Sequence, residues 1–167
     1  MIKLRPILES DLDRIVQLCQ DPEISQMTLN VPYPYNMEHA RFFYDRIVQG
    51  GKSHTLGIHL SDNFDLIGVI GANFNPTKSW AAEIGYWMGK EYRNKGYMTE
   101  ALKQIIQICF QELKLVRVCA CHDPINPASG KVMLNAGMEL EGIFKSYVMK
   151  DSVYRDSIYY SIINPNI

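Results

Sequence analysis

Apolar and polar positions along the chain follow two periods, and the period changes where glycine, proline or asparagine appears. Apolar residues three and four positions apart predict amphipathic helices over 12–19, 37–48, 98–113 and 128–135, the first two capped by Ser10 and Asn36. Alternating or continuous apolar segments predict strands over 2–4, 54–60, 66–74, 81–88, 117–121, 139–149 and 154–163. The chain therefore mixes helices and strands from one end to the other.

The segment 98–113 gives the strongest helical pattern, and it connects the predicted strands 81–88 and 117–121. A strand, helix and strand in this order form a crossover, which makes the two strands parallel and places the helix on one face of the sheet. The three strands before this helix follow one another closely and are expected to be antiparallel. We therefore predict an α/β (α+β) fold with a mixed, mostly antiparallel sheet of about seven strands and helices on both faces.

Composition restricts the kind of protein. A length of 167 residues fits one domain spanning 1–167, with 47 % hydrophobic and 21 % charged residues. Seventeen basic against eighteen acidic residues give a net charge of −1, which argues against nucleic acid as a partner. Neither a signal peptide nor a membrane span is visible in the sequence, so we expect a cytoplasmic protein that does not bind membranes. The cysteines Cys19, Cys109, Cys119 and Cys121 are interpreted as small buried hydrophobic residues without disulfides.

Two prolines stiffen the segment 31–36, because each restricts the residue before it. Tyr33 and Tyr35 are thereby held on a rigid loop, and together with Tyr86 they are candidates for lining a pocket for an acceptor molecule. Partial burial in the core is the alternative interpretation of these aromatic residues.

The turn 89–99 precedes the strongest helix and combines basic side chains with a glycine. The first backbone N–H groups of a helix have no partner within the helix, and the helix dipole adds partial positive charge there. A pyrophosphate group suits this place, with Gly96 allowing close approach of the backbone and Arg93 and Lys95 adding charge. A solvated turn with incidental basic residues is the alternative interpretation.

Arg93 and Gly96 match the signature of the GNAT superfamily of acyl-CoA-dependent N-acetyltransferases, in which Arg or Gln is followed three residues later by glycine. Met98 departs from the glycine or alanine that completes the signature. A wider pattern resembles the RimJ/RimL branch, which acetylates N-terminal amines of ribosomal proteins, and it comprises Glu83-Ile84-Gly85-Tyr86-Trp87-Met88-Gly89, Glu91-Tyr92-Arg93, Lys95-Gly96-Tyr97, Thr99-Glu100-Ala101 and Asn126-Pro127-Ala128-Ser129. The resemblance covers essentially the whole chain.

This resemblance implies that acetyl-CoA is the co-substrate. The strand around Trp87, Met88 and Gly89 would pair with the pantetheine amides, and a backbone N–H near Trp87 or Met88 would polarise the thioester carbonyl. Residues of the following turn would hold the pyrophosphate, and Asn126 would contact the other side of the CoA arm. The implied pyrophosphate-binding residues are Arg93, Asn94, Lys95, Gly96, Tyr97, Met98 and Thr99.

Direct attack of an amine on the thioester needs a base and an acid. Some members of the superfamily use a glutamate at the position of Glu83 as the base, and a polar residue at a strand end is the alternative reading of Glu83. Many members use a tyrosine as the acid where this chain has Met133. Ser129 resembles the serine that the RimJ/RimL branch has and is our candidate acid, although capping a helix would explain it equally well.

We expect no metal, because Cys119-Ala120-Cys121-His122 has no second ligand pair at a suitable spacing and is better explained by core packing. The predicted function is transfer of acetyl from acetyl-CoA to a primary amine, with a protein N-terminus as the expected acceptor. A polyamine or other small amine, and an acyl-CoA-binding module without activity, are the alternatives. The resemblance also allows a homodimer through the last two strands.

Overall fold

The computed structural model describes residues 1–51, 53–75 and 77–167. Its strands form one seven-stranded sheet in the order β1-β2-β3-β4-β5-β7-β6. The strands are β1 (Ile2–Pro6), β2 (Ser53–Leu60), β3 (Leu66–Asn75), β4 (Lys78–Met88), β5 (Arg117–His122), β6 (Glu139–Lys150) and β7 (Val153–Ile163). The helices are η1 (Glu9–Asp11), α1 (Leu12–Leu18), α2 (Pro22–Met27), α3 (Met37–Val48), η2 (Lys90–Tyr92), α4 (Tyr97–Gln111) and α5 (Pro127–Asn135).

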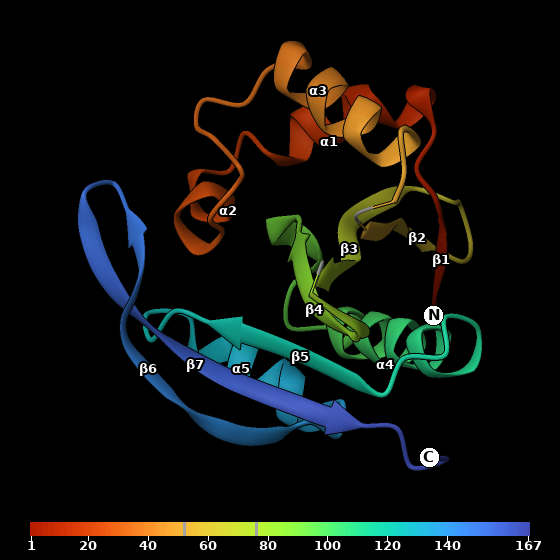
Figure 1. Cartoon of the computed structure of the whole chain (residues 1–167). Helices are drawn as coiled ribbons and strands as arrows, with labels where there is room; N and C mark the ends of the chain where they lie inside the picture. The colour runs from red at the N-terminus through yellow and green to blue at the C-terminus, as the bar shows by residue number, and fades with distance from the viewer. Residues whose placement is uncertain (52, 76) are drawn as a thin grey trace.

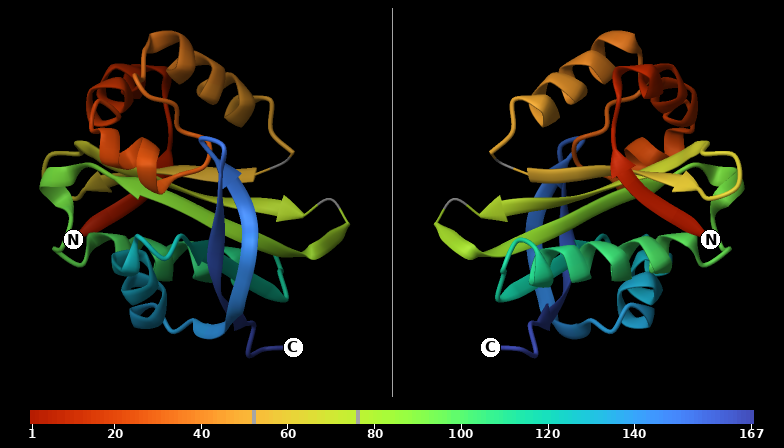
Figure 2. Two further views of the ribbon diagram at one scale, coloured as in Figure 1. Left: turned by 90° about the vertical axis from the view of Figure 1, so that its left-hand side faces the viewer. Right: turned by 90° about the vertical axis from the view of Figure 1, so that its right-hand side faces the viewer.

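Helices cover both faces of the sheet (Figure 2). On one face, α1, α2 and α3 enclose an apolar cluster that includes Ile15, Ile24 and Val69. On the other face, α4 and α5 pack on a larger cluster that includes Ile70, Leu102 and Met133. The predicted α/β fold, with its mixed sheet and helices on both faces, is therefore confirmed.

Strand pairing also follows the prediction. β2, β3 and β4 are antiparallel neighbours, and β4 and β5 are parallel across the α4 crossover. However, β4 and β5 pair only over Ala81↔Arg117, Ala82↔Val118 and Glu83↔Cys119. Beyond Glu83, β4 continues to Met88 beside β3, while β5 runs beside β7. The two central strands thus separate after these three residue pairs. We call the opening between them the β4–β5 split.

The long hairpin of β6 and β7 bends toward α2 (Figure 1). The ammonium group of Lys150, at the end of β6, donates to the backbone carbonyls of Ser25 and Thr28. The Arg155 guanidinium on β7 donates to the carbonyl of Gln26 at 3.4 Å. These contacts join the end of the hairpin to the α2 region.

The helix α2 is absent from the sequence prediction. Its start carries a recognisable signal, because the Asp21 side chain accepts a hydrogen bond from the Glu23 N–H at 3.1 Å and Pro22 occupies the first helical position. At six residues, α2 is too short for apolar periodicity to reveal it. No helix within the described ranges is long and apolar enough to cross a bilayer.

Truncating the buried face of α4 tests the packing of this fold. Leu102 is fully buried against the sheet, so Leu102→Ala should lower the free energy of unfolding by about 2–5 kcal/mol in urea denaturation. Gln107→Ala, on the exposed face of the same helix, should change it by less than about 0.5 kcal/mol. Equal losses in the two variants would contradict this packing.

Candidate active site

Glu83 lies where the β4–β5 split begins, because it belongs to the last residue pair between these strands. Its carboxylate accepts hydrogen bonds from two neighbouring strands. The Tyr159 hydroxyl of β7 donates to Oε2 at 3.4 Å, and the Cys121 thiol of β5 donates to Oε1 at 3.8 Å. Gly85, two residues further on the same face, has no side chain to cover the carboxylate.

The cysteines on β5 differ from the sequence prediction. Cys19 and Cys109 are buried as predicted, but Cys119 and Cys121 are only half-buried and lie on the Glu83 face. His122 points to the opposite face, where it stacks on Tyr160. The alternation of a strand therefore separates the Cys-Ala-Cys-His run into two faces, and it brings Cys121 to Glu83.

Ser129 lies on the other side of the split, where α5 packs below the sheet. Asn126 is the helix cap of α5, since its Oδ1 accepts from the Ser129 N–H at 3.3 Å, so capping does not account for the Ser129 hydroxyl. That hydroxyl instead lies 2.8 Å from the Tyr86 hydroxyl. Burial raises the pKa of Tyr86 to about 12, so both groups stay protonated near neutral pH.

The structure corrects the prediction for Tyr35. Tyr86 faces Ser129 of α5, while Trp87 on the other face of β4 packs against the second apolar cluster. Tyr35 is 7 % exposed within that cluster and does not line a pocket. Its ring lies 5.5 Å from that of His39, and burial raises the pKa of its hydroxyl. Apolar packing at the start of α3 has taken Tyr35 into the core.

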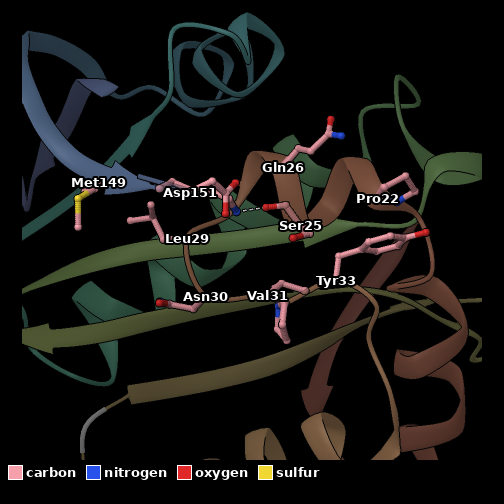
Figure 3. A pocket seen from close by; sticks show the side chains of 11 residues that line it. Pro22, Ser25, Gln26, Leu29, Asn30, Val31, Tyr33, Met149 and Asp151 are labelled. Carbon is pink, nitrogen blue, oxygen red and sulfur yellow. Dashed lines mark hydrogen bonds between the residues drawn. The ribbon is translucent and has the colours of Figure 1, made fainter. Parts of the chain in front are cut away.

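Tyr33 is 56 % exposed and lines an open groove of about 620 Å³ (Figure 3). One wall of the groove comes from α2 and the loop that follows it, and the other from the end of the β6–β7 hairpin. Asp151 is the one carboxylate among its lining residues, which are Pro22, Ser25, Gln26, Leu29, Asn30, Val31, Pro32, Tyr33, Met149, Lys150 and Asp151.

The turn before α4 has the geometry expected of an anion site. Gly96 caps the helix with φ of 80°, a conformation that glycine adopts without strain, and a Cβ placed there would meet nothing within 4 Å. Asn94 is also left-handed, with φ of 60°. The side chains of Tyr97 and Met98 pack against the main core. The Met98 departure from the signature therefore leaves its backbone N–H unobstructed.

Arg93 plays a different part from the one predicted for its side chain. Its guanidinium donates to the Met88 carbonyl at 3.0 Å, to Asp21 at 2.7 Å and to Glu23 at 2.5 Å. Two carboxylates thus balance its charge, and the side chain joins the start of α2 to the end of β4. Lys95, which lies 5.9 Å from the Tyr92 ring, is left to supply the positive side-chain charge of the turn.

These features fit the parts of an acyl-CoA molecule. Beyond Glu83, β4 does not pair with β5 within the described residues, so the polar groups of this edge, apart from the Met88 carbonyl that accepts from Arg93, can bond an amide-bearing arm. The exposed, left-handed glycine and the first amides of α4 suit a pyrophosphate. Asn126 and Ser129 lie at the start of α5, across the split from β4.

Comparisons with known proteins agree with this geometry. Residues 2–139 match the acetyltransferase (GNAT) domain, and the chain belongs to the GNAT acetyltransferase family. It is 33 % identical over 129 residues to the uncharacterized N-acetyltransferase YnaD of Bacillus subtilis, covering 77 % of this chain and 75 % of that protein. It is 28 % identical to the ribosomal-protein-serine acetyltransferase of Escherichia coli, covering 98 % and 93 % of the two chains.

The crystal structure of a GNAT-family acetyltransferase from Bacillus anthracis superposes with a TM-score of 0.88 at 25 % identity, covering 98 % of this chain and 95 % of the other. The resemblance to the GNAT superfamily and its RimJ/RimL branch is therefore confirmed. The protein is an N-acetyltransferase that takes its acetyl group from acetyl-CoA.

The residues that sequence reasoning missed are Tyr159 and Cys121. Both contact the predicted base, yet Tyr159 lies 76 positions away from Glu83 in the chain. Cys121 and Tyr159 are directly opposite each other in the β5–β7 ladder. A prediction that β7, and not β6, lies beside β5 would have placed them together.

The ion pair between Arg117 and Glu141, on the Glu83 face of the sheet, predicts how the stability of the fold depends on pH. Arg117 of β5 binds Glu141 of β6 through both carboxylate oxygens, and this hydrogen bonding lowers the pKa of Glu141 from 4.5 to about 2. A carboxyl with a lowered pKa in the folded state stabilises the fold above its unfolded pKa, and this stabilisation disappears as the pH falls toward the folded value.

Glu141→Gln should therefore lower the free energy of unfolding at pH 7 by about 1 kcal/mol, a modest figure because the Glu141 side chain is 37 % exposed to screening solvent. The difference between wild type and variant should shrink as the pH falls from about 5 to about 2. Glu139→Gln on the same strand serves as the control. A difference that grows on acidification would refute the assignment.

Proposed function

We propose that this N-acetyltransferase modifies the N-terminal α-amine of a protein, of the ribosomal-protein type. The proposal rests on which carboxylates around the site have a basic ion-pair partner and which do not. Glu83 accepts from neutral donors, and among residues 1–51, 53–75 and 77–167 no Arg or Lys lies within ion-pair distance of it. It is thus a single unbalanced carboxylate, which suits one ammonium group.

Three further carboxylates are balanced by basic side chains of the protein itself, whereas Asp151 in the groove is in no ion pair among the described residues. Asp123 pairs with Arg155 at 3.0 Å, Asp156 pairs with Lys145 at 2.9 Å, and Glu141 pairs with Arg117. A polyamine carries several positive charges and would need several unbalanced carboxylates. The grouping of acidic residues therefore favours an acceptor with one ammonium group over a polyamine.

The groove lined by Tyr33 and Asp151 supports a polymeric acceptor. It is open to solvent and lies between α2 and the β6–β7 hairpin, so a chain leading away from the amine has a path across the surface (Figure 3). Arg155 and Tyr159 share one face of β7, which runs from the α2 contact toward the split. The relative from Escherichia coli that is named for acetylating a ribosomal protein supports the same class of acceptor.

Each catalytic role then falls to a named residue. Glu83 takes the proton of the acceptor ammonium, directly or through water, and the neutral amine forms the new C–N bond as the C–S bond breaks. Acetyl-CoA supplies the acetyl group as a thioester. A backbone N–H near Trp87 or Met88 stabilises negative charge on the carbonyl oxygen. The Ser129 hydroxyl, itself hydrogen-bonded to Tyr86, lies on the α5 side to donate to the leaving sulfur.

The acceptor assignment is tested by a panel of amines with detection of the released CoA thiol. Peptides with a free N-terminus should have kcat/KM at least about tenfold above that of spermidine, a difference of 1.4 kcal/mol in transition-state binding. The same peptides blocked by N-acetylation and lacking lysine should release no CoA. Faster turnover of spermidine than of any peptide would contradict the proposal.

The role of Glu83 is tested in the same assay. Glu83→Gln should lower kcat by about 10²-fold or more, because general-base catalysis contributes on that scale, while acetyl-CoA affinity stays unchanged. Glu112→Gln, an exposed carboxylate at the end of α4, is the matched control. Retention of full kcat in Glu83→Gln would remove Glu83 from the mechanism.

A further inference from the structure

Both oxygens of the Glu83 carboxylate are hydrogen-bonded, and each bond comes from a different strand. The Tyr159 hydroxyl reaches Oε2 from β7, and the Cys121 thiol reaches Oε1 from β5. We propose that Tyr159 and Cys121 are positioning residues that hold the Glu83 carboxylate in the orientation needed to accept a proton from the acceptor amine. This inference rests on the proposed role of Glu83 as the base.

Both groups carry a proton that they can donate. Burial and the negative charge of Glu83 raise the pKa of the Cys121 thiol to about 11, and the same two causes raise the pKa of the Tyr159 hydroxyl. Each group therefore keeps its proton near neutral pH. The two side chains also hydrogen-bond each other, so they hold the Glu83 carboxylate as a connected pair.

The ring of Tyr159 is itself fixed by two aromatic neighbours. Phe144 and Tyr147, both on β6, lie with ring centroids 4.8 Å and 5.7 Å from it, and both pairs meet edge to face. Such edge-to-face pairs add stabilisation beyond the burial of apolar area. The hydroxyl thus has a fixed direction toward β4 before any acceptor binds.

Other groups around Glu83 are accounted for within the described residues. Cys119 of β5 lies opposite Glu83 in the ladder, and its thiol donates to the Ala82 carbonyl at 3.6 Å. Asn73 of β3 donates to the backbone carbonyl of Glu83 at 3.3 Å. Beyond Cys119 lie the charges of Lys78 and of the Arg117–Glu141 pair, which act on that thiol. Among the described residues, the carboxylate oxygens of Glu83 accept hydrogen bonds from Tyr159 and Cys121 alone.

Four conservative variants test this inference through steady-state kinetics. Tyr159→Phe keeps the ring among its aromatic neighbours and removes only the donor. It should lower kcat by about tenfold, the effect of one hydrogen bond to a charged group. The KM for acetyl-CoA should not change.

Cys121→Ala should lower kcat by less than Tyr159→Phe does, because a thiol is a weak donor. Cys121→Ser should restore the wild-type kcat, since a hydroxyl also donates. Tyr154→Phe removes an exposed hydroxyl from the same strand and should leave kcat as in the wild type. Thermal unfolding of each variant verifies that it folds, and the Cys121 variants carry the test if Tyr159→Phe does not.

The two proposals fail in distinguishable ways. If Glu83→Gln is inactive but Tyr159→Phe and Cys121→Ala keep the kcat of the wild type, the positioning role is refuted and the base stands. A Cys121→Ser variant that loses as much kcat as Cys121→Ala, or a rise in the KM for acetyl-CoA that accompanies the loss of kcat, would also refute it, because that is the result of a merely structural role. If Glu83→Gln keeps full activity, both proposals fall together.

Discussion

The candidate site of this protein depends on two parallel strands, β4 and β5, that pair over only three residues. β4 and β5 share three residue pairs and then part, although both continue as strands. Backbone N–H and C=O groups need hydrogen-bond partners, so the unpaired edge of β4 is able to bind an extended ligand that carries amides. The α4 crossover adds the amides of its first turn at the end of the same strand. The edge of β4 and the start of α4 thus lie in sequence along the place proposed for acetyl-CoA.

Hydrogen bonds to tyrosine hydroxyls span the split on both faces. Above the sheet, Glu83 of β4 bonds Tyr159 of β7, and below it Tyr86 of β4 bonds Ser129 of α5. The residue proposed as the base and the residue proposed as the acid therefore each have a tyrosine partner. Arg93 holds α2 in place as well, since its guanidinium bonds both Asp21 at the start of α2 and the Met88 carbonyl at the end of β4. The region proposed to receive the acceptor is in this way attached directly to the strand proposed to activate the thioester.

Local sequence patterns predicted the elements, while contacts between distant segments decided the rest. The stripe through Leu102 and the glycine at Gly96 identified α4 and its turn, because helical periodicity and positive φ are properties of short segments. Arg93 could not be understood in the same way, since its partners Asp21 and Glu23 lie about 70 residues away and in a helix that the pattern did not reveal. Tyr35 shows the same limit, because a tyrosine in a loop suits a pocket and a core equally well.

The most direct test of the site is calorimetric titration with acetyl-CoA. Gly96→Asp places a carboxylate where the pyrophosphate is expected, in a residue with positive φ and open space around its Cα. Gly51→Asp is the matched control, because Gly51 also has positive φ and open space but lies in the connection before β2. Micromolar binding by wild type and Gly51→Asp, with loss of binding in folded Gly96→Asp, is the predicted result. Equal binding by all three proteins would contradict a CoA site at the start of α4.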